Sequence, residues 1–200
     1  MKDLFTIGHS NHSLEHFLEL LRMQSISAIC DVRSSPYSKY SPQFNKDVLV
    51  NALPNADIRY VFLGREIGAR RSEESCYVKG RARYDLIAGL PIFRTGLEQV
   101  IQGIETHRVA LMCSEADPLT CHRTILLCRE LMKMQPDLRI THILADGTVE
   151  THKDAQERLI KLHKLQPELF GELTSTSGLV NRAFDLQAER LACGEETVGT

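Results

Sequence analysis

The sequence predicts an α/β protein with a doubly wound, Rossmann-like sheet of about five mostly parallel strands and a C-terminal helical extension. Short apolar segments alternate with amphipathic helical segments, and this order implies crossover connections between parallel strands. The run Val109–Met112 is apolar throughout, as in a strand that is buried on both faces. The chain has 200 residues, enough for one such domain without a stabilising disulfide or metal.

The first half of the chain supplies two strands and two helices. Leu4–Ile7 is the first expected strand. A helix follows Ser13, because serine is a preferred N-cap and apolar residues recur after it at spacings of three and four. Ile26–Cys30 is the second strand. A loop rich in Ser, Pro and Tyr occupies 34–42 and leads to a helix at 45–53.

The second half continues this alternation after a long insertion. Residues 64–83 contain many charges and few aliphatic side chains, so we expect one long loop, a feature that is often functional. The next helical pattern, at 85–105, is interrupted near Gly89–Pro91. The remaining expected elements are strands at 58–63, 108–113 and 139–144 and helices at 85–105 and 121–134.

The last fifty residues change character. Helices are expected at 154–165 and 179–193, and acidic side chains outnumber basic ones after residue 166. We therefore divide the chain into an α/β domain, 1–150, and a helical extension, 151–200, that packs on the same domain.

Composition excludes several classes of protein. A hydrophobic fraction of 42%, a charged fraction of 25% and a net charge of -2 are ordinary globular values and exclude general disorder. No apolar run reaches the roughly 18 residues of a membrane span, and the N-terminus lacks the zones of a signal peptide. We expect a cytoplasmic protein with no membrane partner. Its six irregularly spaced cysteines are then reduced.

Reactive side chains follow three of the expected strands. Ligands of open parallel sheets bind at the carboxyl ends of the strands, so these side chains are expected to share one site. They are His9 and Ser10, then Asp31 and Arg33, then Cys113 and Glu115, with Cys121, His122 and Arg123 opening the next helix.

The first hypothesis for this site is an enzyme. Cys121 lies near a helix start set by Asp117 or Thr120, and a helix N-terminus favours a thiolate. Either Cys121 or Cys113 is then the nucleophile. The groups assigned to proton transfer are His9, Glu115 and Asp31. A plain salt bridge between Asp31 and Arg33 is the alternative, and the sequence does not separate the two interpretations. The groups assigned to an anionic, nucleotide-like substrate are Ser10, Arg33, Tyr37, His122 and Arg123.

The second hypothesis is a metal site. Cys113, Cys121, His122 and His9 offer two sulfur and two nitrogen atoms, a set that suits Zn or Fe. The sequence requires no cofactor. Cys121 and His122 are unfavourable as ligands of the same ion, because neighbouring side chains on a helix diverge by about 100°.

The third hypothesis is a nucleic-acid-binding module without chemistry. Residues 59–83 hold seven basic and three acidic side chains with tyrosines between them. Such a pattern can bind phosphates and stack on bases. The residues assigned to this surface are Arg65, Arg70, Arg71 and Arg81.

The motifs together resemble a known family. Thr6–Ser10, Asp31–Arg33 with Pro36 and Ser38, Leu63–Gly64, Cys113-x-Glu115 and Cys121–Arg123 are similar to the domain-of-unknown-function family 488. The resemblance covers about residues 3–145. It implies a cytoplasmic α/β domain of bacterial type with no established activity, and shared positions at His9, Asp31, Arg33, Cys113, Glu115, Cys121, His122 and Arg123. The stretch Leu63–Gly68 departs from the family, whose members often have a Leu-Gly-Gly turn there.

Overall fold

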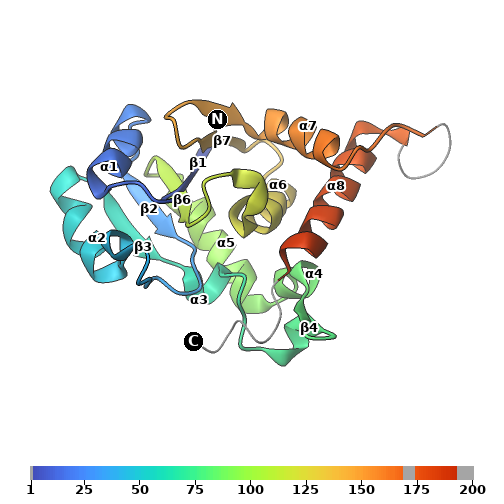
Figure 1. The fold of residues 1–200 in the computed structure, drawn as a ribbon, viewed down its shortest axis with the longest axis horizontal. Helices are drawn as coiled ribbons and strands as arrows, with labels where there is room; N and C mark the ends of the chain where they lie inside the picture. The colour runs from blue at the N-terminus through green and yellow to red at the C-terminus, as the bar shows by residue number, and fades with distance from the viewer. Residues whose placement is uncertain (1, 169–173, 193–200) are drawn as a thin grey trace.

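A six-stranded sheet forms the centre of the protein (Figure 1). The computed structural model describes residues 2–168 and 174–192. The strand order is β3-β2-β6-β1-β7-β8, in which the first five strands run parallel and β8 is antiparallel to β7. The strands are β1 Asp3–Gly8, β2 Ala28–Asp31, β3 Arg59–Phe62, β6 Val109–Cys113, β7 Arg139–Ile143 and β8 Val149–Thr151. This confirms the predicted mostly parallel α/β fold.

Strand β8 is the one strand of this sheet that the sequence did not predict. It has only three residues and returns from β7 through a turn in which Gly147 has a φ of 85°. The Asp146 carboxylate accepts hydrogen bonds from the backbone N–H and the hydroxyl of Thr148, which fixes that turn. A strand this short shows no alternation that sequence could detect.

Helices cover both faces of the sheet. Helices α1 and α2 lie on one face, and α5 with α6 on the other. The side chains of β1 alternate accordingly, because Leu4 packs into the α5 side and Phe5 into the α1 side. The helices are α1 Leu14–Met23, α2 Lys46–Ala52, α3 Gly64–Ile67, α4 Tyr84–Ala88, α5 Pro91–Gly103, α6 Arg129–Met134, α7 His152–Leu162 and α8 Thr176–Leu191.

The segment between β6 and α6 departs from a regular helix. Asp117 caps a short 3-10 turn, Pro118–Thr120, by accepting a hydrogen bond from the Leu119 N–H. Residues Arg123–Cys128 then form π-helical turns that run into α6. The helix expected from residue 121 therefore starts two residues later and is not α-helical at first. Such π segments are frequent at functional sites.

The predicted loop at 64–83 contains secondary structure, which corrects that expectation. It begins with α3 and holds a small hairpin of β4 Tyr77–Val78 and β5 Arg81–Ala82. Cys76, which sits among charged residues in the sequence, is fully buried under this hairpin. Two-residue strands and a four-residue helix are too short to give a periodic signal.

The two C-terminal helices pack on the segment between β6 and α6. Ala155 and Leu159 of α7 and Ala183 and Phe184 of α8 form one apolar cluster with Leu119 and Ile125. Gln187 of α8 donates a hydrogen bond to the Leu119 carbonyl over 2.7 Å. Cys193, the end of the last expected helix, lies outside the described residues. Among the described residues, no helix is long and apolar enough to cross a membrane.

Candidate functional site

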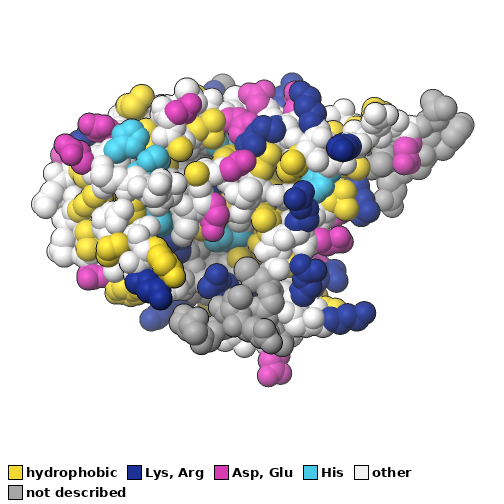
Figure 2. All heavy atoms as spheres, viewed as in Figure 1, with side chains coloured by type: hydrophobic (Ala, Val, Ile, Leu, Met, Phe, Trp, Pro, Cys, Tyr) yellow, Lys and Arg dark blue, Asp and Glu magenta, His cyan; other side chains and the backbone are white. Residues whose placement is uncertain are grey.

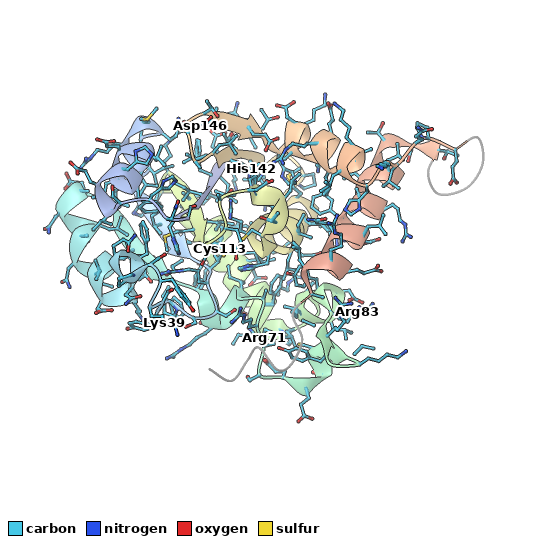
Figure 3. The ribbon with its side chains drawn as sticks, viewed as in Figure 1. Lys39, Arg71, Arg83, Cys113, His142 and Asp146 are labelled. Carbon is cyan, nitrogen blue, oxygen red and sulfur yellow. The ribbon has the colours of Figure 1, made fainter. Side chains whose placement is uncertain are left out.

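The carboxyl ends of β1, β2 and β6 bring the predicted side chains to one edge of the sheet. Strand β6 lies between the other two, so Cys113 stands at the centre of this edge (Figure 3). The backbone pairing continues past the strands, because the His9 N–H donates to the Cys113 carbonyl over 2.8 Å. The Val32 N–H likewise donates to the Met112 carbonyl over 3.0 Å. The residues after three separate strands are therefore held in fixed register.

Cys113, Cys121 and His122 form a compact group of sulfur and nitrogen atoms. Their ligand atoms all lie within 4.8 Å of one another. The Nδ1 atom of His122 is 3.7 Å from the Cys113 sulfur and 3.9 Å from the Cys121 sulfur. Both cysteines are buried and His122 is half-buried. The structure thus brings together three of the four residues of the metal hypothesis.

The backbone conformation at Cys121 and His122 allows the side chains of these adjacent residues to point toward a common centre. Cys121 is extended, with φ of -132° and ψ of 141°, whereas His122 has helical angles. The two residues therefore do not share one helix, and their side chains can converge. The expectation of divergent side chains was wrong because the helix begins after Cys121.

The other ring nitrogen of His122 fixes its tautomer. Nε2 donates to the carbonyl oxygen of Val32 over 3.0 Å. Nδ1 consequently presents its lone pair to the two sulfurs whenever the ring is neutral. Val32 itself was not a predicted site residue, although it lies between two that were.

Cys121 is the more acidic of the two thiols. Burial raises the pKa of Cys121, but hydrogen bonding from the Cys113 thiol, the charge of Arg123 and contact with His122 together hold it well below its usual value. The backbone N–H of Arg123 also donates to the Cys121 sulfur over 3.4 Å. The interaction with Cys121 and burial raise the pKa of Cys113 well above its usual value. The pair therefore favours one thiolate, on Cys121.

Arg123 holds the loop that carries Glu115. Its guanidinium is fully buried and donates from Nη1 to the Glu115 carbonyl over 2.6 Å and from Nη2 to the Ala116 carbonyl over 3.1 Å. The same loop presses against β1, where a Cβ added to Gly8 would lie 1.8 Å from the Glu115 carbonyl oxygen. Arg123 was expected to bind an anionic substrate, but its Nη1 and Nη2 atoms donate to the protein backbone, and its buried Nε atom has no partner in the structure.

Asp31 and Arg33 form a buried ion pair. Arg33 donates from Nε and Nη2 to the two Asp31 carboxylate oxygens over 2.9 and 2.6 Å. Tyr60, which sequence reasoning missed, donates its hydroxyl to Asp31 over 2.7 Å, and burial is the main cause that raises the pKa of that hydroxyl. Arg33 also reaches the Phe44 carbonyl. Both residues take part in this network, in agreement with the salt bridge that the sequence left open as the alternative to proton transfer by Asp31 and anion binding by Arg33.

His9 belongs to the same network rather than to the sulfur group. Its Nδ1 donates to the Ser10 carbonyl over 2.9 Å, and its Nε2 accepts from Arg33 over 3.2 Å. The ring also stacks on Phe44 with centroids 4.4 Å apart. Burial is the main cause that lowers the pKa of His9 to about 4. Both nitrogens are occupied, so His9 is not the fourth ligand of the metal hypothesis.

Glu115, Ser10 and Tyr37 lie around the edge of the group. The Glu115 residue is exposed, yet loss of hydration and the interaction with Cys121 raise the pKa of its carboxyl, whereas hydrogen bonding with Cys113 lowers it. The Ser10 hydroxyl donates to the side chain of neighbouring Asn11. Tyr37 is exposed on the loop after β2, beside Lys39 and Tyr40.

The four arginines of the nucleic-acid hypothesis do not form one free surface. Arg71 is buried and donates to the Glu73 carboxylate and to the backbone carbonyls of Arg65 and Glu66. The guanidinium of Arg71 therefore binds acceptors within its own loop, whereas the sequence predicted that it binds nucleic acid. Arg65, Arg70 and Arg81 have exposed side chains.

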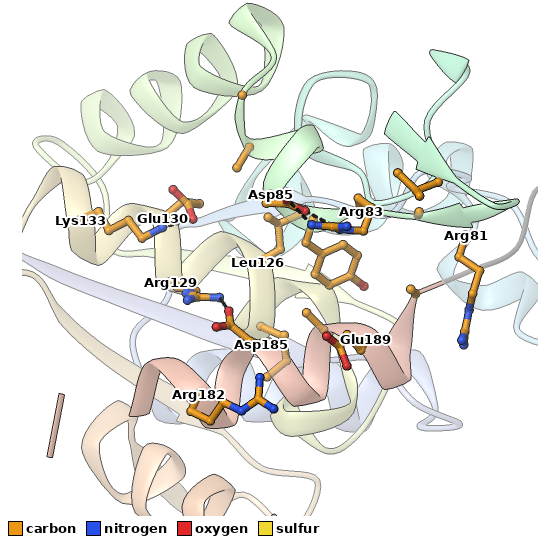
Figure 4. Close-up of a pocket in the computed structure, with 18 residues that line it drawn as sticks. Arg81, Arg83, Asp85, Leu126, Arg129, Glu130, Lys133, Arg182, Asp185 and Glu189 are labelled. Atoms are coloured by element: carbon orange, nitrogen blue, oxygen red, sulfur yellow. Dashed lines mark hydrogen bonds and ion pairs between the residues drawn. The ribbon is translucent and has the colours of Figure 1, made fainter. Parts of the chain in front are cut away.

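A separate cavity of about 890 Å³ lies between the β4–β5 hairpin, α6 and α8 (Figure 4). Lys and Arg side chains gather on this part of the surface (Figure 2). Many are paired, as Arg129 is with Asp185 over 2.7 Å and Lys133 with Glu130 over 2.6 Å. None of the residues of the sulfur group lines this cavity.

Comparison with known protein families gives one match. Residues 13–129 match the family described as Domain of unknown function DUF488. The match spans more than half of the chain and includes Cys113, Glu115 and Cys121–Arg123, whereas His9 and Ser10 precede it. Comparison with curated proteins and with solved structures gives no match. The chain belongs to the DUF488 family.

Proposed function

We propose that this protein binds a divalent transition-metal ion, Zn²⁺ in the first place and Fe²⁺ in the second, through Cys113, Cys121 and His122. The observation that carries the proposal is the spacing of the three ligand atoms. Zn–S bonds of 2.3 Å and Zn–N bonds of about 2.0 Å at a tetrahedral angle separate sulfur from nitrogen by about 3.5 Å. The two distances from His122 Nδ1 are 3.7 and 3.9 Å.

The surroundings of the ligands support this proposal. A metal-binding histidine almost always donates its second ring N–H to a carbonyl or carboxylate, which is the role of Val32 toward His122. The Arg123 N–H hydrogen bond to Cys121 stabilises negative charge on a sulfur ligand. Two sulfurs and one imidazole nitrogen are a soft set that favours Zn²⁺ over Mg²⁺ or Ca²⁺.

Elemental analysis with native mass spectrometry tests the proposal. The protein is purified under reducing conditions without chelator, and one metal ion per chain is expected. Cys113→Ala, Cys121→Ala and His122→Ala should each lower the metal content at least tenfold. Cys30→Ala is the matched control, because Cys30 is also a buried free cysteine near a strand end but lies outside the group. A chain that stays metal-free after incubation with Zn²⁺ would overturn the proposal.

A second candidate function rests on the acidity of Cys121. Its thiolate, favoured by Arg123 and His122, has the character of an enzyme nucleophile. If the metal is absent, metal-free Cys121 should react with iodoacetamide faster than a free thiol near pH 7. The pH dependence of alkylation, measured with Cys121→Ala as blank, separates this function from metal binding, since bound Zn²⁺ protects the sulfur.

A further inference from the structure

Cys113 and Cys121 form a close pair of thiols whether or not a metal is bound. Cys113 is the last residue of β6, and Cys121 follows the short turn Pro118–Thr120. Their sulfur atoms lie within 4.8 Å of each other. The S–S bond of a disulfide is about 2.05 Å long, so the two sulfurs need to approach by at most roughly 3 Å. The two thiols are therefore placed for a covalent bond between them.

The segment between the two cysteines is held in place by the protein itself. Arg123 donates to the Glu115 and Ala116 carbonyls over 2.6 and 3.1 Å. The Asp117 carboxylate accepts a hydrogen bond from the Leu119 N–H over 2.9 Å. These hydrogen bonds use no metal ion, so the two sulfurs stay close in the metal-free chain. Two groups held in this way react much faster with each other than with a partner from solution.

The register of the sheet excludes Cys30 as a competing partner of Cys113. Cys30 on β2 pairs with Leu111 on β6, two positions before Cys113. The spacing between strands and the rise along a strand then separate the Cα atoms of Cys30 and Cys113 by roughly 8 Å. A disulfide spans at most about 7 Å between Cα atoms. The geometry therefore favours Cys121 over Cys30 as the partner.

Burial of the two sulfurs selects the class of oxidant. Cys113 and Cys121 are 4% and 2% exposed, and half-buried His122 lies next to both. A disulfide oxidant such as oxidised glutathione must bring its own bulky S–S bond into contact with a sulfur. Hydrogen peroxide needs access for two oxygen atoms only. We therefore expect the oxidant to be a peroxide rather than a disulfide compound.

We propose that peroxide converts Cys113 and Cys121 into a reversible disulfide and thereby releases the metal ion. The release rests on the proposed metal binding, whereas the disulfide does not. One thiolate sulfur attacks a peroxide oxygen, the O–O bond breaks, and hydroxide leaves a sulfenic acid on that cysteine. The second thiolate sulfur attacks the sulfenic sulfur and displaces a second hydroxide. The two cysteines together lose two electrons, which reduce the peroxide, and both hydroxide ions take up protons to become water.

The disulfide and the metal exclude each other because both need the same two sulfurs. A cysteine binds a metal as a thiolate. In the disulfide neither sulfur carries this negative charge, so His122 alone remains of the three ligands. Metal binding and oxidation are therefore alternative states of one site, and peroxide shifts the chain from the first to the second.

The test treats the Zn²⁺-loaded full chain with hydrogen peroxide in the presence of 4-(2-pyridylazo)resorcinol, a dye that reports free Zn²⁺. One Zn²⁺ per chain should be released while peptide mass spectrometry shows a cross-link between Cys113 and Cys121. Dithiothreitol should reverse both changes. Oxidised glutathione at the same concentration should act at least about tenfold more slowly. Cys30→Ala is the matched control, because it removes a buried thiol outside the group and should respond like the wild type.

The variant His122→Ala separates the disulfide from metal binding, because it keeps both sulfurs and loses one ligand. Peroxide should cross-link its cysteines although it holds little metal. Sulfinic acid in place of a cross-link, in this variant and in the metal-free wild type, would refute the disulfide. A cross-link formed without release of Zn²⁺ would refute the switch. If the wild type holds no Zn²⁺ before oxidation, the proposed metal binding fails and the release with it, and cross-linking in the same sample then decides the disulfide alone.

Discussion

His122 and Val32 are 90 positions apart in the chain, yet the Nε2 atom of His122 lies 3.0 Å from the Val32 carbonyl oxygen. This contact crosses from the segment after β6 to the end of β2. It turns Nδ1 of the imidazole toward both sulfurs. The orientation of the His122 ring in the proposed site therefore depends on a backbone carbonyl at the end of another strand. Substitution of the three ligands alone would not reveal this dependence.

Loss of the buried ion pair should destabilise the fold strongly. Asp31→Ala leaves the Arg33 cation buried without its partner, so we expect the free energy of unfolding to fall by about 3–5 kcal/mol. Urea denaturation measures the change. Asp85→Ala is the matched control, because the Arg83–Asp85 pair is exposed to solvent and its loss should change stability far less. Equal effects of the two substitutions would contradict this interpretation.

Substitution of Gly8 should disturb the loop that carries Glu115. The Cβ of Gly8→Ala would lie 1.8 Å from a backbone oxygen, so the chain must shift, at a cost of about 1–3 kcal/mol. We also expect weaker metal binding, since Cys113 is paired with Gly8 across the sheet. Gly103→Ala is the control, because its Cβ would lie an ordinary 3.6 Å from Val109 and alanine is favoured over glycine in a helix. A wild-type urea midpoint for Gly8→Ala would refute the prediction.

Arg123 should contribute to stability through the two carbonyls it satisfies. Arg123→Ala leaves the Glu115 and Ala116 carbonyls without these donors and opens space in the core, so a loss of roughly 3 kcal/mol or more is expected. Arg94→Ala removes an exposed pair with Glu98 and should change stability by less than about 0.5 kcal/mol. Thermal unfolding of both variants checks the difference, and a mild effect at Arg123 would show that the loop holds without it.

The protein should lose stability in weak acid. Burial lowers the pKa of His9 and of His152 to about 4, and the pKa of buried His142 lies well below its usual value. The unfolded chain binds protons at these rings near pH 6.5, so between pH 6.5 and 4 it binds more protons than the folded chain. Stability therefore falls as the pH falls through this window, by roughly 3 kcal/mol each for His9 and His152.

Urea titrations between pH 7.5 and 4.5 measure this loss. His152→Phe removes one ring of the buried His142–His152 contact, whose nitrogens are 3.1 Å apart, and should reduce the slope of stability against pH. His107→Gln is the control, because His107 is only half-buried, at the bend after α5, and its hydrogen bond is to neighbouring Thr106. A flat stability profile in the wild-type protein would contradict the assignment of buried neutral imidazoles.

The order of strands and helices was predictable because each long element carries a periodic apolar pattern. The fully apolar run at Val109–Met112 did become a central strand buried on both faces. The π-helical turns after Cys121, the strand β8 and the β4–β5 hairpin were not predictable, since they are short or are defined by hydrogen bonding rather than by periodicity.

The location of the candidate site was predictable from strand ends, but the partners of its side chains were not. Arg123 was expected to face a ligand, and for Arg33 a ligand and a salt bridge with Asp31 were both open; both arginines satisfy buried acceptors of the protein. Sequence shows that a cation is present but not which acceptor lies opposite it. Tyr60 was missed for the same reason, because its contact with Asp31 exists only through the pairing of β2 with β3.

The three proposed ligands come from ten consecutive residues, 113–122. Denaturation would not scatter them, so the denatured chain retains a local chelator with appreciable affinity. Metal binding to the denatured state subtracts from the stabilisation that mass action gives the native state. The rise in Tm on adding metal should therefore fall short of the value calculated from the native dissociation constant. The shortfall measures how much of the affinity is already encoded in the contiguous peptide.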